Sequence, residues 1–262
     1  MKLTISLGQM DIVPGDPDAN IAKASQMARH ASDAGADVLV LPELWSTGYV
    51  LKRAGELADA VGHGVFAEVQ RLSDEHAIHI VGSCLSKDVS NQYANTSVWT
   101  APGGRALGQY NKLHLFRLMH EDQFLKPGDR PVLIDSPWGK AGMAICYDLR
   151  FPELFSSYAT DGAIMVLIPA QWPKVRVEHW KTLLRARAIE NQMFVIACNC
   201  VGQIGPTVFG GHSCVIDPWG EIPIQAGDQE EVVTTVIDTD QIDDVRARIP
   251  VFSDRRTDLF QF

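Results

Sequence analysis

The sequence predicts an α/β protein in which helices cover two packed β-sheets. Segments with the apolar spacing of helices alternate with short apolar strands along the whole chain. The strands outnumber the helices and several come in hairpin-like pairs, which favours two packed sheets over one open parallel sheet. Apolar residues make up 46% and charged residues 21% of the chain, as in a globular protein with a full core.

The first half of the chain is predicted to contain two helices and five strands. A strand at 3–8 precedes a helix that begins after Asp16-Pro17-Asp18 and ends at Gly35, because these residues supply a cap and a stop. A second helix is predicted at 65–76, and further strands at 38–41, 78–84, 96–100 and 106–110. The last two strands flank the turn Pro102-Gly103-Gly104 and should pair.

The second half continues the alternation. Strands are predicted at 142–145, 164–168, 194–198, 213–216 and 232–237, and helices at 152–160, 177–189 and 241–248. Pro152 fits the first turn of its helix, where a missing N–H costs nothing. The chain shows no internal repeat and no single linker. We therefore expect one domain over residues 1–262.

Charge and hydropathy exclude several classes of partner. The chain has 23 Lys and Arg against 32 Asp and Glu, for a net charge of -9, and so lacks the basic field that nucleic acid requires. No apolar run approaches the roughly 20 residues that cross a bilayer, and residues 1–10 do not resemble an export signal. We expect a cytoplasmic protein that binds neither nucleic acid nor membrane.

The cysteines are predicted to be free thiols, since they are odd in number and form no CxxC pair. They are Cys84, Cys146, Cys198, Cys200 and Cys214. The nearest pair of histidines, His76 and His79, lies across a predicted helix-to-strand boundary. We therefore expect no metal site.

Three segments place a reactive side chain just after an apolar strand, where α/β folds build their sites. These side chains are Glu43, Lys112 and Cys146. Backbone N–H groups around such a cysteine lower its thiol pKa and offer an oxyanion site, while a carboxylate acts as base and a lysine neutralises the anion. Spacing alone also fits a turn cap at Glu43, a surface lysine and a core cysteine.

The residues around these three positions resemble the three signatures of the nitrilase superfamily of carbon–nitrogen hydrolases. The matching segments are Leu41-Pro42-Glu43, Tyr110 through Phe116, and Ile145 through Glu153. The resemblance covers essentially the whole chain and the signatures occur in the family's order. It implies a four-layer αββα sandwich and a catalytic triad of Glu43, Lys112 and Cys146.

The resemblance also implies further site residues. The oxyanion would be held by Lys112 and the backbone N–H of Tyr147. The family's second glutamate, seven residues before a glycine in a Pro-Gly turn, matches Glu121 before Gly128. The alternative for Glu121 is a solvated loop charge beside Asp122.

Residues next to the cysteine narrow the reaction. Cys146-Tyr147-Asp148 resembles amidases, whereas true nitrilases usually carry Cys-Trp-Glu. Further segments are similar to the omega-amidase branch, which hydrolyses 2-oxoglutaramate and 2-oxosuccinamate: Ala170 through Pro173, Lys181 through Asn191, Gly211-His212-Ser213 and Ile249 through Phe252. The nearest rival is the amidase that acts on deaminated glutathione.

The resemblance thus implies a small-molecule amide substrate, a cysteine thioester intermediate and neither metal nor cofactor. Two alternatives from other classes stay open. One is a family member that binds without turnover, which an ammonia-release assay would detect. The other is a metal-dependent hydrolase, which would be sensitive to a chelator and for which the sequence offers no ligand set.

An omega-amide carries a carboxylate away from the scissile amide, and Arg150 is the candidate to bind it. A guanidinium binds a carboxylate through two parallel hydrogen bonds, and Arg150 lies four residues after the nucleophile. The alternative is a structural ion pair with Glu153 or Asp148. Tyr49 and Trp172, on loops after strands, are candidates for the pocket wall.

Members of the family pair as dimers across the helix after the nucleophile and the helix that matches Arg185-Ala186-Arg187. The tail at 249–262 resembles one that reaches over the partner. Its apolar residues are unusual for a free end; they are Val251, Phe252, Leu259, Phe260 and Phe262. We therefore expect a homodimer, with packing of the tail on its own chain as the alternative.

Overall fold

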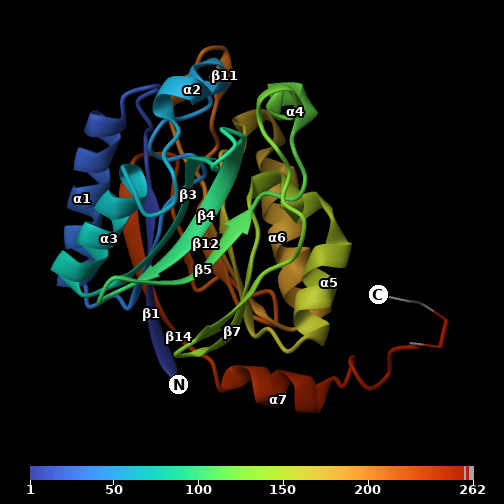
Figure 1. The fold of residues 1–262 in the computed structure, drawn as a ribbon. Coiled ribbons are helices and arrows are strands. Elements are labelled where there is room, and N and C mark those ends of the chain that lie inside the picture. Colours follow the sequence, from blue (N-terminus) through green and yellow to red (C-terminus); the bar gives the residue numbers. More distant parts are fainter. Residues whose placement is uncertain (257, 260–262) are drawn as a thin grey trace.

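Within residues 1–256, 258 and 259, which the computed structural model describes, the chain forms two six-stranded sheets between two layers of helices. Figure 1 shows α1 (Pro17–Asp33) and α3 (Val65–His76) on one outer side and α5 (Pro152–Thr160) and α6 (Val177–Asn191) on the other. The predicted αββα sandwich is confirmed.

The first sheet has the strand order β14-β1-β2-β3-β4-β5. Its members are β1 (Lys2–Gln9), β2 (Val38–Val40), β3 (His79–Lys87), β4 (Tyr93–Ala101), β5 (Arg105–Asn111) and β14 (Glu231–Asp238). Strands β1, β2 and β3 are parallel, and β4 and β5 form the predicted antiparallel hairpin. The parallel strands therefore end at one edge of the sheet.

The second sheet has the order β13-β12-β9-β8-β7-β6. Its members are β6 (Leu133–Ser136), β7 (Gly139–Met143), β8 (Met165–Pro169), β9 (Phe194–Cys198), β12 (Cys214–Ile216) and β13 (Ile224–Gln225), and β10 (Gln203–Ile204) pairs separately with β11 (Thr207–Val208). Strands β7, β8 and β9 are parallel. Each sheet thus has a central parallel part whose strand ends can carry functional loops.

Apolar packing holds the layers together. Leu7 and Val40 of the first sheet belong to one buried cluster with Met143 and Leu167 of the second, so this cluster fills the space between the sheets. Each such side chain contributes about 1.5 to 3 kcal/mol when it is fully buried. A separate cluster packs α1 and α3 against the outer face of the first sheet.

Local signals explain where the helices begin and end. The Asp16 carboxylate accepts the backbone N–H of Ala19 and caps α1, and Gly35 follows the helix with a φ of 71° that favours glycine. Helices α3, α5 and α7 (Gln241–Arg248) have the predicted bounds. Several short elements were not predicted: β6, β10, β11, β13, η1 (Leu51–Arg53), α2 (Ala54–Leu57), η2 (Arg117–Met119), α4 (Glu121–Phe124), η3 (Cys146–Arg150) and η4 (Lys174–Arg176).

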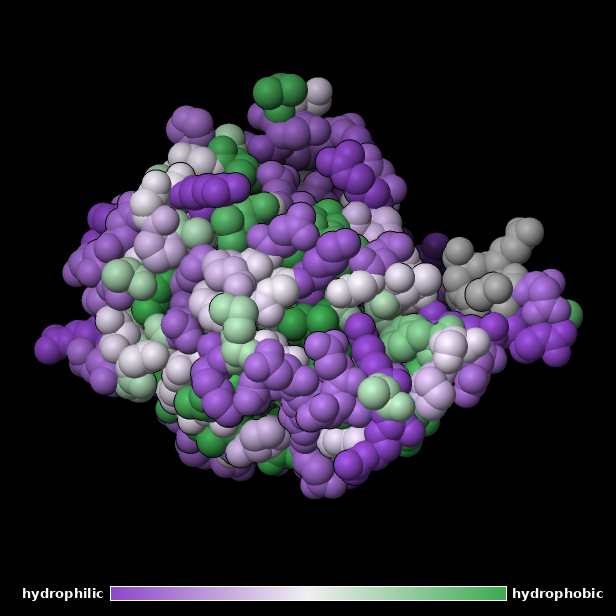
Figure 2. Space-filling view, turned by 90° about the horizontal axis from the view of Figure 1, so that it is seen from below, coloured by the Kyte–Doolittle hydropathy of each residue, from purple (hydrophilic) through white to green (hydrophobic). Residues whose placement is uncertain are grey.

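The described residues after α7, 249–256, 258 and 259, extend away from the body of the molecule, as the view from the α7 side also shows (Figures 1 and 2). Its first part is attached to its own chain, since the side-chain amide of Gln192 donates to the carbonyl of Ile249 at 2.8 Å. The Phe252 ring lies 4.8 Å from the guanidinium groups of both Arg246 and Arg255. Leu259 is 62% exposed, and Phe260 and Phe262 lie outside the described residues. Among the described residues, no helix is both long and apolar enough to span a bilayer.

Candidate active site

The loops after three strands bring Glu43, Lys112 and Cys146 together between the sheets. Glu43 follows β2, and the next residue, Leu44, has a φ of 42°. Ser83 on β3 holds this turn, because its hydroxyl accepts the Leu44 N–H at 2.9 Å and its carbonyl accepts the Trp45 N–H at 3.1 Å. The turn directs the Glu43 side chain into the interior, where its exposure is 0%.

Lys112 follows β5 and is fixed by its backbone. Its N–H donates to the carbonyl of Asn95 at 2.9 Å, and its carbonyl accepts the N–H of Gly128 at 2.9 Å. A Cβ atom at Gly128 would lie 2.3 Å from the carbonyl oxygen of Asn111. Only glycine fits this approach, so the predicted Pro-Gly turn supports the lysine from outside.

Cys146 begins a 3₁₀ turn with a φ of 46°, a left-handed conformation that costs a non-glycine residue about 1 to 3 kcal/mol. The buried Asp148 carboxylate holds the turn by accepting the Ile145 N–H at 3.0 Å. It also accepts the Tyr110 hydroxyl at 2.6 Å and the His114 N–H at 2.9 Å. Asp148 thereby ties the cysteine turn to the lysine segment.

A buried ionic network joins Glu43, Lys112 and Glu121. Lys112 Nζ lies 2.7 Å from Glu43 Oε1 and 2.7 Å from Glu121 Oε1, and all three side chains have zero exposure. Tyr49 donates into the same network, with its hydroxyl 2.7 Å from each of these carboxylate oxygens. The surface alternatives for Lys112 and Glu121 are therefore wrong.

Glu43 is also oriented by uncharged donors. The side-chain amide of Asn95 donates to Oε1 at 2.8 Å, and the backbone N–H of Gln171, after β8 of the second sheet, donates to Oε2 at 2.9 Å. The Cys146 thiol lies beside the same carboxylate, whose charge raises the pKa of the thiol. Glu43 is thus placed to remove the thiol proton.

The electrostatics of the thiol differ from the sequence-based expectation. Burial raises the pKa of Cys146 well above its usual range, the adjacent Glu43 raises it further, and Lys112 offsets only part of the effect. The predicted lowering of this pKa is wrong, because the turn lies in the interior beside a carboxylate. Proton removal by Glu43 is therefore needed to form the thiolate.

The two other charged groups respond to the same burial. Burial would lower the pKa of Lys112, but Glu121 and Glu43 outweigh it and raise that pKa, so the side chain remains an ammonium. Burial raises the pKa of Glu121, against the opposing effect of Lys112. A cation fixed beside the thiol can stabilise an oxyanion without competing for the proton.

A narrow cavity leads to Cys146, whose exposure is 5%. It is lined by Phe116, Cys146, Tyr147, Arg150, Gln171, Trp172, Pro173 and Arg176. Three of these eight residues are aromatic and two are arginines. This composition suits a small substrate with an anionic end.

The chain matches the family model described as carbon–nitrogen hydrolase over residues 4–247. It belongs to the carbon–nitrogen hydrolase family. This hydrolase is 43% identical over 260 residues to the 2-oxoglutaramate amidase of Bacillus subtilis, with 99% of this chain and 100% of the relative covered. It is 31% identical to the human omega-amidase NIT2, with 92% and 91% covered.

Solved structures of relatives share the fold. A carbon–nitrogen hydrolase superfamily protein from Xanthomonas campestris, with an arsenic adduct in its active site, has a TM-score of 0.92 at 29% identity and covers 100% of this chain and 99% of its own. A mutant amidase from Nesterenkonia sp. AN1, in which acrylamide has added to the active-site cysteine, has a TM-score of 0.84 at 26% identity with 96% and 99% covered.

Of the three residues predicted to bind the substrate, two line the cavity of this hydrolase and the third, Tyr49, lies at the buried glutamates. Trp172 and Arg150 line the cavity beside Cys146, as does Tyr147. Within the described residues Arg150 makes no ion pair with Glu153 or Asp148; its guanidinium instead donates to His179 Nδ1 at 3.2 Å and lies 4.9 Å from the Trp172 ring. Tyr49 contacts the two glutamates.

Sequence reasoning missed several residues that hold the hydrolase site. Asn95 and Gln171 orient Glu43, and Arg176 lines the cavity with its guanidinium 5.6 Å from the Phe116 ring. Arg187 of α6 donates to the Leu149 carbonyl at 2.9 Å and so supports the nucleophile turn. The sequence does show polar residues within apolar strands and directly after them. This pattern does not indicate which of these side chains contact one another.

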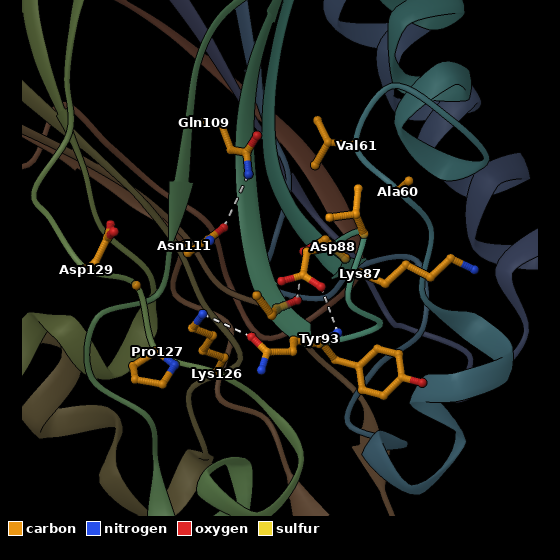
Figure 3. A pocket seen from close by; sticks show the side chains of 15 residues that line it. Ala60, Val61, Lys87, Asp88, Tyr93, Gln109, Asn111, Lys126, Pro127 and Asp129 are labelled. Carbon is orange, nitrogen blue, oxygen red and sulfur yellow. Dashed lines mark hydrogen bonds between the residues drawn. The ribbon is translucent and has the colours of Figure 1, made fainter.

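A second hollow lies behind the lysine segment and is separate from the catalytic cavity. Figure 3 shows that Asn111, the neighbour of Lys112, lines this hollow together with Gln109 and Lys126. Lys126 donates to the side chain of Gln92 at 3.0 Å. Glu43, Lys112 and Cys146 are absent from its lining among the described residues.

Proposed function

We propose that this hydrolase is a thiol-dependent amidase that converts a small omega-amide such as 2-oxoglutaramate into the carboxylic acid and ammonia. The observation that carries the proposal is that the buried Glu43 pairs with Lys112 and lies beside the Cys146 thiol, which reaches a cavity lined by aromatic residues and arginines. The 43% identity with a 2-oxoglutaramate amidase over nearly the whole chain supports the choice of substrate.

In the proposed reaction Glu43 takes the thiol proton and Cys146 Sγ attacks the amide carbon. Lys112 and the Tyr147 backbone N–H stabilise the oxyanion of the tetrahedral intermediate. The proton on Glu43 passes to the leaving nitrogen, ammonia departs and a thioester forms. Water, activated by a glutamate, then hydrolyses the thioester and restores the thiol, so the cycle is ping-pong.

Arg150 is our candidate to bind the distal carboxylate, and Trp172 to form the pocket wall. Arg150→Lys should raise KM for 2-oxoglutaramate, because the loss of one bidentate pair of hydrogen bonds costs about 1 to 3 kcal/mol of binding free energy. The effect on KM for an uncharged amide should be smaller. The measurement is steady-state ammonia release with both substrates. Equal losses on both, together with a lower melting temperature, would assign Arg150 to structure.

The substrate assignment is tested by ammonia release from a panel that includes 2-oxoglutaramate, 2-oxosuccinamate, deaminated glutathione and small nitriles. We expect the highest kcat/KM with the two omega-amides. Preference for deaminated glutathione would assign the chain to the rival amidase activity. No release from any amide would support a binding role without turnover.

We further propose a cytoplasmic homodimer of one domain per chain. Leu259 beyond α7 and Ile189 on α6 are exposed apolar side chains in the regions that the family resemblance assigns to pairing. Light scattering at micromolar concentration should report twice the mass of the 28.8 kDa chain. A monomer would refute the dimer.

A further inference from the structure

The hydroxyl group of Tyr49 has one proton but two carboxylate neighbours. Its oxygen lies 2.7 Å from Glu43 Oε1 and 2.7 Å from Glu121 Oε1. A phenol donates one hydrogen bond, so it satisfies one of these contacts only. Lys112 Nζ lies 3.4 Å from the same oxygen. Because the ammonium group only donates, it does not supply the tyrosine oxygen with a second hydrogen bond to a carboxylate. The second contact is a hydrogen bond only when the carboxyl group itself carries a proton and donates it to the Tyr49 oxygen.

Charge and burial lead to the same proton count. Lys112, Glu43 and Glu121 all have zero exposure, and with both glutamates ionised the cluster would carry an uncompensated negative charge. A charge without a partner is costly in an interior, and one added proton makes the cluster neutral. Burial raises the pKa of Glu121, which favours Glu121 as the resting position of that proton.

We propose that Glu43 and Glu121 share one proton and that the Tyr49 hydroxyl transfers it between them. The Glu121 carboxyl O–H donates its proton to the Tyr49 oxygen while the Tyr49 O–H gives its own proton to the Glu43 carboxylate. Glu121 becomes ionised, Glu43 becomes neutral and Tyr49 is restored. Tyr49 thus acts through the two glutamates as a positioning residue.

The transfer assigns different glutamates to the two half-reactions, and this assignment rests on the proposed amidase function. Ionised Glu43 serves thioester formation, in which it takes the thiol proton and returns it to the departing ammonia. After the transfer, ionised Glu121 takes the proton of the attacking water, and neutral Glu43 protonates the departing Cys146 thiolate. The cluster then has its starting charges again.

Tyr49→Phe tests this inference, with Tyr158→Phe as the matched control. Tyr158 also has a buried hydroxyl, which donates to the Met143 carbonyl at 2.6 Å, but it lies outside the cluster. Rapid mixing of each protein with 2-oxoglutaramate separates the release of ammonia from the release of the acid product. In Tyr49→Phe we expect acid release to slow by about a hundredfold or more relative to ammonia release, within the range of one general acid–base contribution.

The outcomes distinguish this inference from the proposed function. If Tyr49→Phe leaves the ratio of acid release to ammonia release unchanged, Tyr49 does not transfer the proton and the inference is overturned. A similar change in this ratio in Tyr158→Phe would also overturn the inference, because the loss of a buried hydroxyl outside the cluster would then have the same effect. Absence of ammonia release by the wild type would instead contradict the amidase proposal.

The shared proton is also testable without turnover and without Tyr49→Phe, should that variant fail to fold. The infrared difference spectrum between the wild type and the isosteric variant Glu121→Gln at neutral pH should contain the carbonyl band of one protonated carboxyl group, with a shift in D₂O. A spectrum that shows only the loss of an ionised carboxylate would refute the shared proton.

Discussion

Asp148 and Glu43 are both fully buried carboxylates near the nucleophile, yet their partners give them different functions. Asp148 accepts two backbone N–H groups, from Ile145 and His114, as well as a tyrosine hydroxyl. Glu43 pairs with an ammonium group, accepts from a shared phenol and from the Gln171 backbone N–H, and lies beside the reactive thiol. Both carboxylates accept backbone N–H groups, and what distinguishes Glu43 is the ammonium of Lys112 and the reactive thiol beside it, which make it the base.

The largest effect is expected on turnover, when the thiol beside Glu43 is removed. Cys146→Ala should reduce turnover by more than about a hundredfold, because the covalent step is lost while little packing changes. Ammonia release and circular dichroism measure the two effects. All five cysteines lie in the described part of the chain as buried free thiols, and the four others serve as controls: Cys84, Cys198, Cys200 and Cys214. Activity retained above a hundredth in Cys146→Ala would reject the nucleophile.

The next largest effect concerns the charge balance around Glu43. Lys112→Met should lower the free energy of unfolding by about 3 to 5 kcal/mol, since it leaves buried glutamates without their cation. Urea denaturation measures the change. Lys126→Met is the control, because Lys126 is exposed and hydrogen-bonded to Gln92. Similar values for the two variants would contradict the strong coupling in the buried network.

A smaller loss is expected at Asp148. Asp148→Asn should destabilise the fold by about 1 to 3 kcal/mol, because an amide cannot accept at both oxygen positions from the present donors. Turnover should fall as well, since the turn that carries Cys146 loses its anchor. Urea denaturation and ammonia release follow the two losses. Full activity with lowered stability would show that the turn keeps its shape without Asp148.

The smallest effect is a pH dependence of stability. Because the Cys146 pKa is raised in the folded protein, the thiol stays protonated above about pH 8.5 while the unfolded chain loses its proton. Stability should therefore fall with rising pH, by about 1.4 kcal/mol per pH unit for each such thiol. Between pH 9 and 10, Cys146→Ala should show a shallower fall than the wild type in urea denaturation. Equal slopes would contradict the raised pKa.

The sequence predicted the layers. It also singled out Glu43, Lys112 and Cys146, each after an apolar strand within a recognisable motif, and the structure places these three side chains next to one another. The sequence could not predict how Asn95 and Gln171 meet Glu43, because those contacts depend on register and on the packing of one sheet against the other. The strand β6 was missed because it is four residues long with a single buried side chain. The thiol pKa was predicted with the wrong sign, since depth in the interior is not visible in local spacing.

The link between Glu43 and Gln171 has a consequence for how the protein assembles. Glu43 follows a strand of the first sheet and Gln171 a strand of the second, and the Gln171 backbone and side-chain amides both bind Glu43. The base is therefore in place only when the two sheets have come together. During refolding, amide hydrolysis should return with the closure of the sandwich rather than with the formation of either sheet, so activity can report when assembly is complete.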